Sequence, residues 1–234
     1  MRRVVPIFSF AVVCVSLSGC WQGITREVLA TVLSVRGEAV WAMEGRNDLR
    51  PITSRTKFGA GSVVRTFQDA QIDVTLLPSA LARISSNSEL KIEKLRLSKD
   101  GNETEDGMRS RVVSVQLNRG KISALFQRRD ESEMRFTIGT RQATISADDN
   151  CLFQVREEET KTRVTCVRGK VYVSQGDRQM SVLDAGYLQE WPSERLTAIA
   201  AADDARGQID VSDALEAERK LQELQSKQRL RLPF

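Results

Sequence analysis

The sequence of 234 residues contains no histidine. Histidine is the commonest general base and metal ligand in proteins, and it activates the serine or cysteine nucleophile of many hydrolases. Its absence therefore excludes most hydrolytic mechanisms. The chain also lacks a phosphate-binding glycine loop and a cysteine pair at metal-ligand spacing. We accordingly expect no catalytic residue, no bound metal and no cofactor.

The composition is that of a folded protein. Hydrophobic residues make up 41% of the sequence and charged residues 28%, close to the average of soluble domains, so there is enough apolar material for a core. The length allows one large domain or two small ones.

Residues 1–19 have the pattern of an export signal. The basic start Met1-Arg2-Arg3 precedes an apolar stretch at 4–17. As a helix, this stretch would reach about 21 Å, which is too short for the ~30 Å hydrocarbon core of a membrane. It is therefore predicted to be a signal peptide and not a membrane-spanning helix.

The end of this segment resembles a bacterial lipoprotein signal. Leu17-Ser18-Gly19-Cys20 is similar to the lipobox, in which small residues allow cleavage before a lipidated cysteine. We expect a diacylglycerol and palmitate on Cys20, with 20–29 as anchor and linker; a secretory signal with a chance cysteine is the alternative. In the lipoprotein family, a residue other than Asp after that cysteine usually directs export to the outer membrane. Here it is Trp21, which implies an outer-membrane lipoprotein facing the periplasm.

The net charge gives little support to nucleic-acid binding. The formal charge of +4 falls to +2 once Arg2 and Arg3 leave with the signal. Nucleic-acid binding depends on many Lys and Arg contacts to phosphates, and the predicted compartment contains almost no nucleic acid. The expected partners are the membrane, through Cys20, and an envelope protein or glycan. The oligomeric state is not predicted.

Two further cysteines remain in the exported chain, Cys151 and Cys166. Because the periplasm is oxidising, they are predicted to form a disulfide. A hairpin that places them opposite each other would leave 157–160 as a four-residue loop, an accepted hairpin length. Two buried free thiols are the alternative.

Alternation of apolar and polar residues dominates the region 30–191. Turn signals interrupt it every eight to twelve residues, which predicts an all-β fold, either a short-stranded sandwich or a solenoid-like roll. The expected strands are 30–35, 39–42, 62–66, 71–76, 81–84, 89–93, 112–117, 121–126, 133–138, 143–146, 151–156, 162–167, 170–174, 180–183 and 187–191.

A short motif recurs three times along these strands. Arg36, Arg119 and Arg168 are each followed by a glycine and then by Glu or Lys. The glycine allows a positive φ at a bend before the next strand. The three arginines are either solvated turn residues or a row that contacts an anionic ligand or partner.

The C-terminal part has a different pattern. Residues 192–211 are predicted to be a linker, and 212–234 a helix with a short tail. Asp213 with Glu216 makes a plausible helix start, and a thin apolar stripe follows. We expect this C-terminal α-helix to pack loosely on the β domain, with packing on a partner as the alternative.

The order of the β segments resembles the FecR domain family. The fragments that carry the resemblance are 30–41, 61–66, 72–84, 88–92, 115–122, 136–140, 167–171 and 183–186. The chain departs from the family at 147–153, which keeps an aromatic residue but lacks the usual glycine. Signalling members of the family carry an anti-sigma segment and a membrane-spanning helix before this domain, and here a lipid anchor is expected in place of both. The resemblance therefore implies a periplasmic interaction or ligand-sensing module.

Three functions remain open at this stage. The first is a non-enzymatic envelope lipoprotein whose β domain binds or senses another envelope component. The second is a structural or assembly lipoprotein that acts through its C-terminal helix. The third is a carboxylate-based hydrolase that uses Asp148 and Asp149 or the run 157–159, although such runs in turns are ordinarily solvated.

Overall fold

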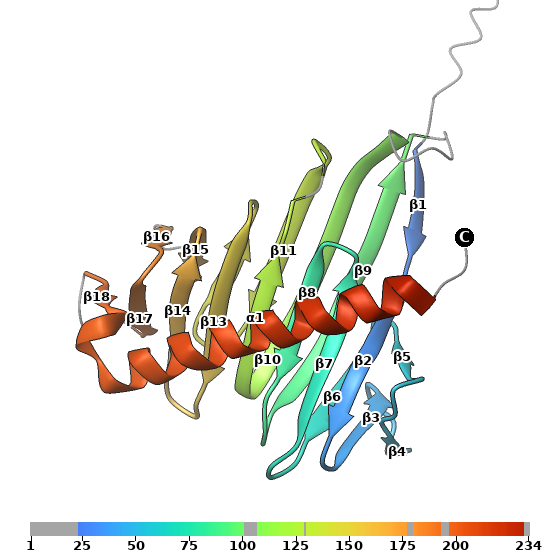
Figure 1. The fold of residues 1–234 in the computed structure, drawn as a ribbon, viewed down its shortest axis with the longest axis horizontal. Helices are drawn as coiled ribbons and strands as arrows, with labels where there is room; N and C mark the ends of the chain where they lie inside the picture. The colour runs from blue at the N-terminus through green and yellow to red at the C-terminus, as the bar shows by residue number, and fades with distance from the viewer. Residues whose placement is uncertain (1–22, 101–106, 129, 177–179, 193–196, 232–234) are drawn as a thin grey trace, which may run out of the picture.

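The structure is a computed structural model that describes residues 23–100, 107–128, 130–176, 180–192 and 197–231 (Figure 1). Two layers of β-sheet enclose the core, and one long helix lies across the outside of one layer. The predicted all-β class with a C-terminal helix is confirmed. The signal segment and Cys20 lie outside the described residues, so lipidation stays a prediction.

The first layer, sheet A, lies on the side away from the helix. In spatial order it contains β4 (Arg50–Pro51), β3 (Ala39–Met43), β6 (Ser62–Thr66), β9 (Glu89–Lys99), β10 (Met108–Phe126), β11 (Glu133–Gly139), β12 (Thr144–Ala147), β15 (Lys170–Ser174) and β16 (Ser181–Asp184), with β1 (Ile24–Glu27) beside the end of β9. β10 and β11 run parallel, and the other pairs are antiparallel.

The second layer, sheet B, carries the helix on its outer face. In spatial order it contains β5 (Lys57–Phe58), β2 (Ala30–Arg36), β7 (Gln71–Leu77), β8 (Ala80–Ile84), the second half of β10, β13 (Cys151–Glu157), β14 (Thr162–Arg168), β17 (Tyr187–Trp191) and β18 (Ile199–Ala200).

The recurring Arg-Gly motif marks the places where the chain passes between the layers. Gly37 and Gly169 connect strands of sheet B to strands of sheet A, and Gly120 lies where β10 crosses from sheet A into sheet B. All three have a positive φ, between 72° and 89°. The predicted turn chemistry is confirmed, but the two strands expected around Gly120 form one continuous strand.

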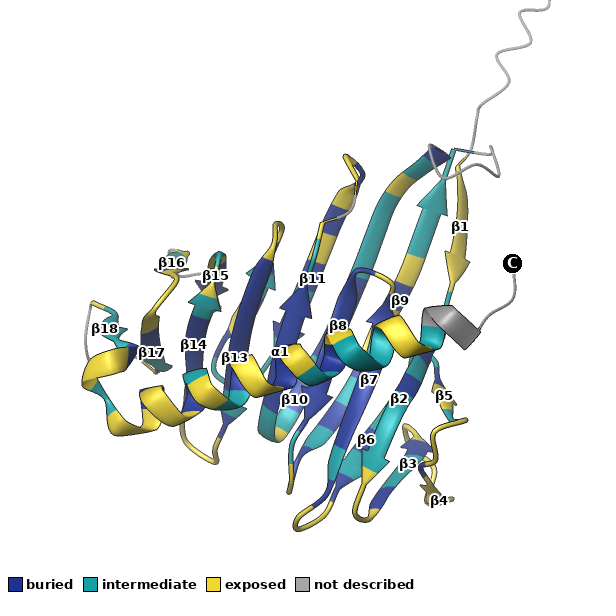
Figure 2. Cartoon of the chain, in the orientation of Figure 1, coloured by how far each residue is buried: buried dark blue, intermediate teal, exposed yellow. Residues whose placement is uncertain are grey.

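Alternate side chains of both layers meet in a single apolar core. Phe136 of sheet A lies between Phe126 and Phe153 of sheet B, with ring centroids 5.8 and 5.9 Å apart. Figure 2 shows the buried residues along the strands of both layers, whereas the outward side of the helix is exposed. Each layer turns one face to this core, and the alternation read from the sequence has this physical origin. The central strands β8, β13 and β14 of sheet B are buried on both faces, because α1 covers the outer one.

The C-terminal helix, α1 (Ala205–Arg231), is longer than predicted and follows a short turn, η2 (Ala201–Asp203). It begins at Ala205 and not at residue 212, because Asp204 is its N-cap: the Asp204 Oδ1 accepts a hydrogen bond from the Gly207 N–H at 2.7 Å. Part of the predicted linker is thus helical. Among the described residues, no helix combines the length and the apolar composition that crossing a membrane requires.

The cysteine hairpin forms, but its predicted register is wrong. Cys166 lies opposite Phe153 and not opposite Cys151, and Glu157 pairs with Thr162 across a four-residue loop. The four-residue loop is 158–161 and not 157–160, so every pair up to Phe153 and Cys166 is displaced by two positions and the two cysteines are diagonal neighbours. A bulge lies beyond this pair, next to Leu152. Both thiols are buried and free in this structure, and the disulfide stays a prediction.

Candidate functional site

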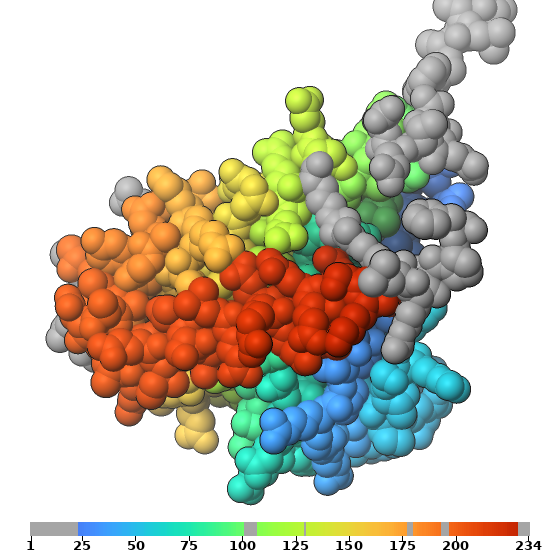
Figure 3. All heavy atoms as spheres, viewed as in Figure 1, coloured from blue at the N-terminus to red at the C-terminus, as the bar shows by residue number. Residues whose placement is uncertain are grey.

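A network of hydrogen bonds and ion pairs lies between sheet B and α1. Alternate residues of the central strands point outward from sheet B, and this row contains several long charged side chains. The helix crosses these strands from β17 toward β2, as a band on the surface (Figure 3). Successive carboxylates of α1 thereby meet successive strands.

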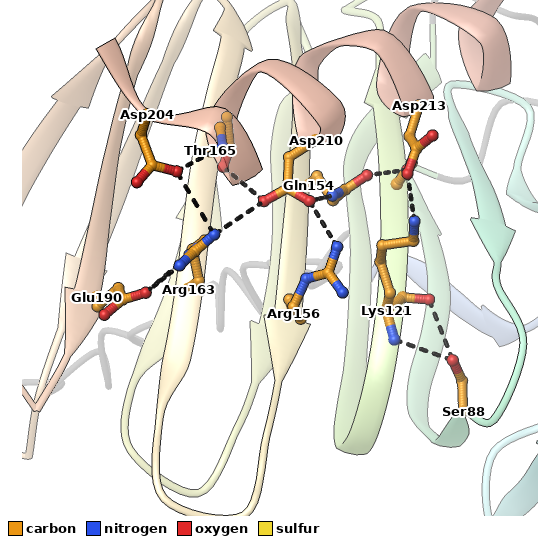
Figure 4. Close-up of polar contacts among 12 residues, drawn as sticks. Ser88, Lys121, Gln154, Arg156, Arg163, Thr165, Glu190, Asp204, Asp210 and Asp213 are labelled. Atoms are coloured by element: carbon orange, nitrogen blue, oxygen red, sulfur yellow. Dashed lines mark hydrogen bonds and ion pairs between the residues drawn. The ribbon is translucent and has the colours of Figure 1, made fainter. Parts of the chain in front are cut away.

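Asp210 is the centre of this network (Figure 4). Its side chain is 1% exposed, although a carboxylate is costly to bury without partners. Arg156 donates a hydrogen bond to Asp210 Oδ1 at 2.7 Å, Gln154 donates another to the same oxygen, and Thr165 donates to Oδ2 at 3.4 Å. All three donors come from neighbouring strands, β13 and β14. The sheet therefore supplies a preformed set of donors for one helix carboxylate.

Arg163 lies beside this cluster and is almost fully buried. Its guanidinium donates from Nε and Nη2 to the Glu190 carboxylate of β17, with Nε at 2.8 Å, and this hydrogen bond lowers the pKa of Glu190. The remaining nitrogen, Nη1, lies 3.8 Å from Asp204 and 3.9 Å from Asp210. The start of α1 thus lies over a guanidinium that is already paired on its other side.

Further ion pairs continue along the helix. The Lys121 ammonium contacts Asp213, and the Ser88 Oγ accepts the Lys121 backbone N–H at 2.9 Å. Arg83 is held by Asp73 at 2.7 Å and lies 3.6 Å from Glu216. These contacts fix the direction in which α1 crosses the sheet.

The apolar part of the interface is small. Three side chains of α1, those of Ala214, Ala217 and Leu221, are fully buried. They pack against three leucines of sheet B, which are Leu81, Leu125 and Leu152. The predicted apolar stripe is confirmed in these positions, but the packing is closer and more polar than the loose contact expected.

A cleft of about 560 Å³ opens next to this interface, between β17 and the start of α1. Its walls include cations and carboxylates, among them Lys161, Arg163 and Glu190, together with the apolar Leu188 and Ile199. The charged groups pair with one another. The cleft therefore has both polar and apolar walls, which suit a ligand with both kinds of group.

The three arginines of the repeated motif are exposed and lie apart. Arg36 on β2 and Arg168 on β14 are separated by four intervening strands, about 24 Å at the usual strand spacing. Arg168 forms a bidentate pair with Glu218 of α1, at 2.7 and 2.9 Å, which raises its pKa. Arg119 lies opposite Glu89 on β9. No small anion could contact all three arginines. Binding of an anionic ligand by this row stays a prediction, and such a ligand would have to be extended.

The carboxylates considered for catalysis are divided between the two ends of β13. Asp148 and Asp149 are exposed in the turn before this strand, whereas Glu157 ends it, about 20 Å away. Glu157 is buried, unlike Glu158 and Glu159, and this burial raises its pKa despite a hydrogen bond from Thr162. The two clusters therefore do not form one acid and base pair. Within the described ranges, no group of side chains has the composition of a metal site.

The residues of the α1 network were not predicted as a site. A signal was present, because Asp210, Asp213 and Ala217 have the three- and four-residue spacing of one helix face. It was missed because the helix was expected to begin after Asp210. The sequence pattern also gives no indication of which sheet face such a helix covers.

Residues 62–172 match the FecR protein family. The FecR-matched region runs from β6 to β15, so it covers less of the chain than the resemblance at 30–186, and the flanking strands belong to the same two layers. Proteins of this family are associated with the cell envelope and are typically not enzymes.

Two solved structures are similar to the chain at low identity. Both are crystal structures of a candidate anti-sigma factor from Parabacteroides distasonis ATCC 8503, at 18% and 20% identity and with a TM-score of 0.40. Each similarity covers 55% of this chain and 53% of that protein, so about half of each is included. No curated protein matches the chain in sequence.

Proposed function

We propose that the chain is a non-enzymatic lipoprotein of the bacterial outer membrane, held by lipid on Cys20, whose β domain binds another envelope component. The observation that carries the proposal is the FecR match over 62–172, since that family is envelope-associated and typically not enzymatic. Within each carboxylate cluster the residues are exposed in turns, apart from the buried Glu157, and this also favours binding over turnover.

The edges of the sheets suggest where a partner binds. β4 contains Pro51, which has no N–H to donate, and β5 and β18 have two residues each. β16 is a four-residue strand that pairs with β15 and, in the part of the chain that the structure describes, ends sheet A. Its free edge can accept an extended strand of a partner by β-augmentation.

The side chains near β16 fit this role. Val182 is 51% exposed and Met180 57%, so an apolar strip accompanies the free strand edge. Natural proteins usually protect such an edge with charged side chains. Here the charge of Asp184 is paired with Lys170, so it protects the edge less. We therefore assign the partner as an envelope protein that presents an extended, partly apolar segment; a glycan is the alternative outcome of the test.

The helix is a weaker candidate for holding an assembly together. Its inward carboxylates, Asp210, Asp213 and Glu218, are engaged by the chain's own sheet. Because these carboxylates already contact the chain's own sheet, we favour the β domain over the helix as the part that binds a partner.

Copurification with charge variants tests the proposal. The tagged full chain is crosslinked in native envelopes and isolated, alongside Val182→Lys and the matched variant Leu49→Lys, whose position is 50% exposed at the opposite edge. Wild type and Leu49→Lys should retain the same partner, and Val182→Lys should lose it. Equal retention by all three would refute the edge assignment, and no partner above the untagged control would refute binding.

A further inference from the structure

The docked helix leaves buried donors of sheet B unpaired. Arg163 Nη1 and Arg156 Nε are buried, and neither finds a hydrogen-bond partner among the described residues. The Arg163 side chain is 9% exposed, and its nearest carboxylates in α1 and the preceding cap are 3.8 to 3.9 Å away, beyond hydrogen-bond distance. An N–H group that is buried without a hydrogen-bond partner destabilises the folded state. The outer face of sheet B therefore has more donor capacity than α1 uses.

Few apolar side chains of α1 are fully buried against sheet B. Of its three fully buried side chains, two are alanines, Ala214 and Ala217, and only Leu221 is large. Buried ion pairs specify geometry but add little net stability relative to apolar packing. Elements with few buried apolar contacts are those that open first in native proteins.

Sheet B does not depend on α1 for its own hydrogen bonds. Its strands pair with one another from β5 to β18. The hydrogen bonds described above between α1 and the sheet are made by side chains. If α1 leaves, the exposed face combines a leucine row with a row of cations. The leucines are Leu81, Leu125 and Leu152, and the cations are Arg83, Lys121, Arg156 and Arg163.

We propose that the outer face of sheet B is a receptor surface for an acidic amphipathic helix of a partner protein, and that α1 is its displaceable resident. Charge complementarity identifies the occupant, because α1 itself fits by presenting Asp210, Asp213 and Glu216 to these cations. A partner helix with carboxylates closer to Arg163 Nη1 would satisfy the donor that α1 leaves free. This surface is separate from the β16 edge.

The test uses the full chain and a labelled peptide of residues 201–231 as the probe. Asp210→Asn weakens the resident helix, so this variant should bind the wild-type peptide about tenfold more tightly than the wild-type chain does, which corresponds to about 1.4 kcal/mol. The matched variant Glu223→Gln alters an outward carboxylate paired only with Lys220 and Lys227, and it should bind like wild type. Adding Arg156→Ala to Asp210→Asn should abolish the gain.

Amide exchange of the wild-type chain provides a readout that does not depend on any variant folding. Amides of α1 should exchange with a smaller opening free energy than those of β13 and β14. A common opening free energy for α1 and these strands, absence of saturable peptide binding to Asp210→Asn, or binding insensitive to Arg156→Ala would each overturn the proposal. Partner capture through Val182 is measured separately, so a failure here is distinguishable from a failure of the proposed function.

Discussion

Gly120 lies against Ser88 so closely that a Cβ at position 120 would be 2.5 Å from the Ser88 Cα and 2.3 Å from its Oγ. The same serine accepts the Lys121 backbone N–H at 2.9 Å. This contact lies where β10 leaves sheet A for sheet B, with φ at +89°. The crossing of the central strand therefore depends on a residue without a side chain.

Gly120→Ala should lower the free energy of unfolding by about 3 kcal/mol or more, because steric overlap adds to the cost of a positive φ. Gly45→Ala is the matched control: its φ is +73°, but no atom lies within 4 Å of the added Cβ. It should cost about 1 kcal/mol. Urea denaturation measures both, and equal losses would mean that the close approach to Ser88 has no energetic role.

Glu157 should make stability depend on pH. Its folded pKa is raised above 4.5 by burial, so its favourable contribution is full below pH 4.5 and is lost as the pH rises through the folded pKa. Glu157→Gln, which keeps a neutral side chain, should therefore be more stable than wild type at pH 7.5, and the difference should shrink at pH 4. Glu158→Gln, in the exposed turn, should show no such difference. A Glu157→Gln variant that is less stable at pH 7.5 would contradict this assignment.

Both thiols should resist alkylation while the protein is folded. Burial raises the pKa of Cys166 to about 12 and also raises that of Cys151, so little thiolate is present near neutral pH. Iodoacetamide at pH 8 should label neither cysteine until the chain is unfolded. Rapid labelling of the folded chain would refute the burial. A chain from the envelope that stays unlabelled after unfolding, and is labelled only after reduction, would carry the predicted disulfide.

Much of the fold could be predicted because alternate residues of both layers point into the shared apolar core. The strand at 62–66 was expected from alternation alone and is β6, and the strand at 170–174 is β15. The helix start could not be found in this way, because Gly207 interrupts the helical pattern and its N-cap, Asp204, lies in a polar stretch. A side chain at position 207 would be crowded by the backbone of η2, since a Cβ there would lie 2.8 Å from the Ala201 carbonyl oxygen.

The candidate site was harder to predict than the fold. The contact between Asp210 and Arg156 joins residues 54 positions apart, and nothing local to either residue indicates it. The predicted register of the cysteine hairpin was wrong for a related reason. A loop at 158–161 in place of 157–160 changes the pairing by two positions, so Cys166 lies opposite Phe153 and the same residues stay on the apolar face.

Lipidation of Cys20 should be detected by metabolic labelling with a clickable fatty acid. Cys20→Ser should abolish the label and leave unprocessed precursor, since the lipobox requires the thiol. Cys14→Ser, within the apolar stretch of the signal, should retain both label and processing. A label that persists in Cys20→Ser would show that the lipobox interpretation is wrong.

Site-specific photo-crosslinking in living cells tests most directly that the β domain binds an envelope partner. The full chain carries a photoreactive residue at position 182 on β16 or, as the control, at position 49 at the opposite edge. The account predicts a discrete, light-dependent adduct with one envelope protein from position 182 and none from position 49. No adduct at 182, or the same adduct from both positions, would contradict it.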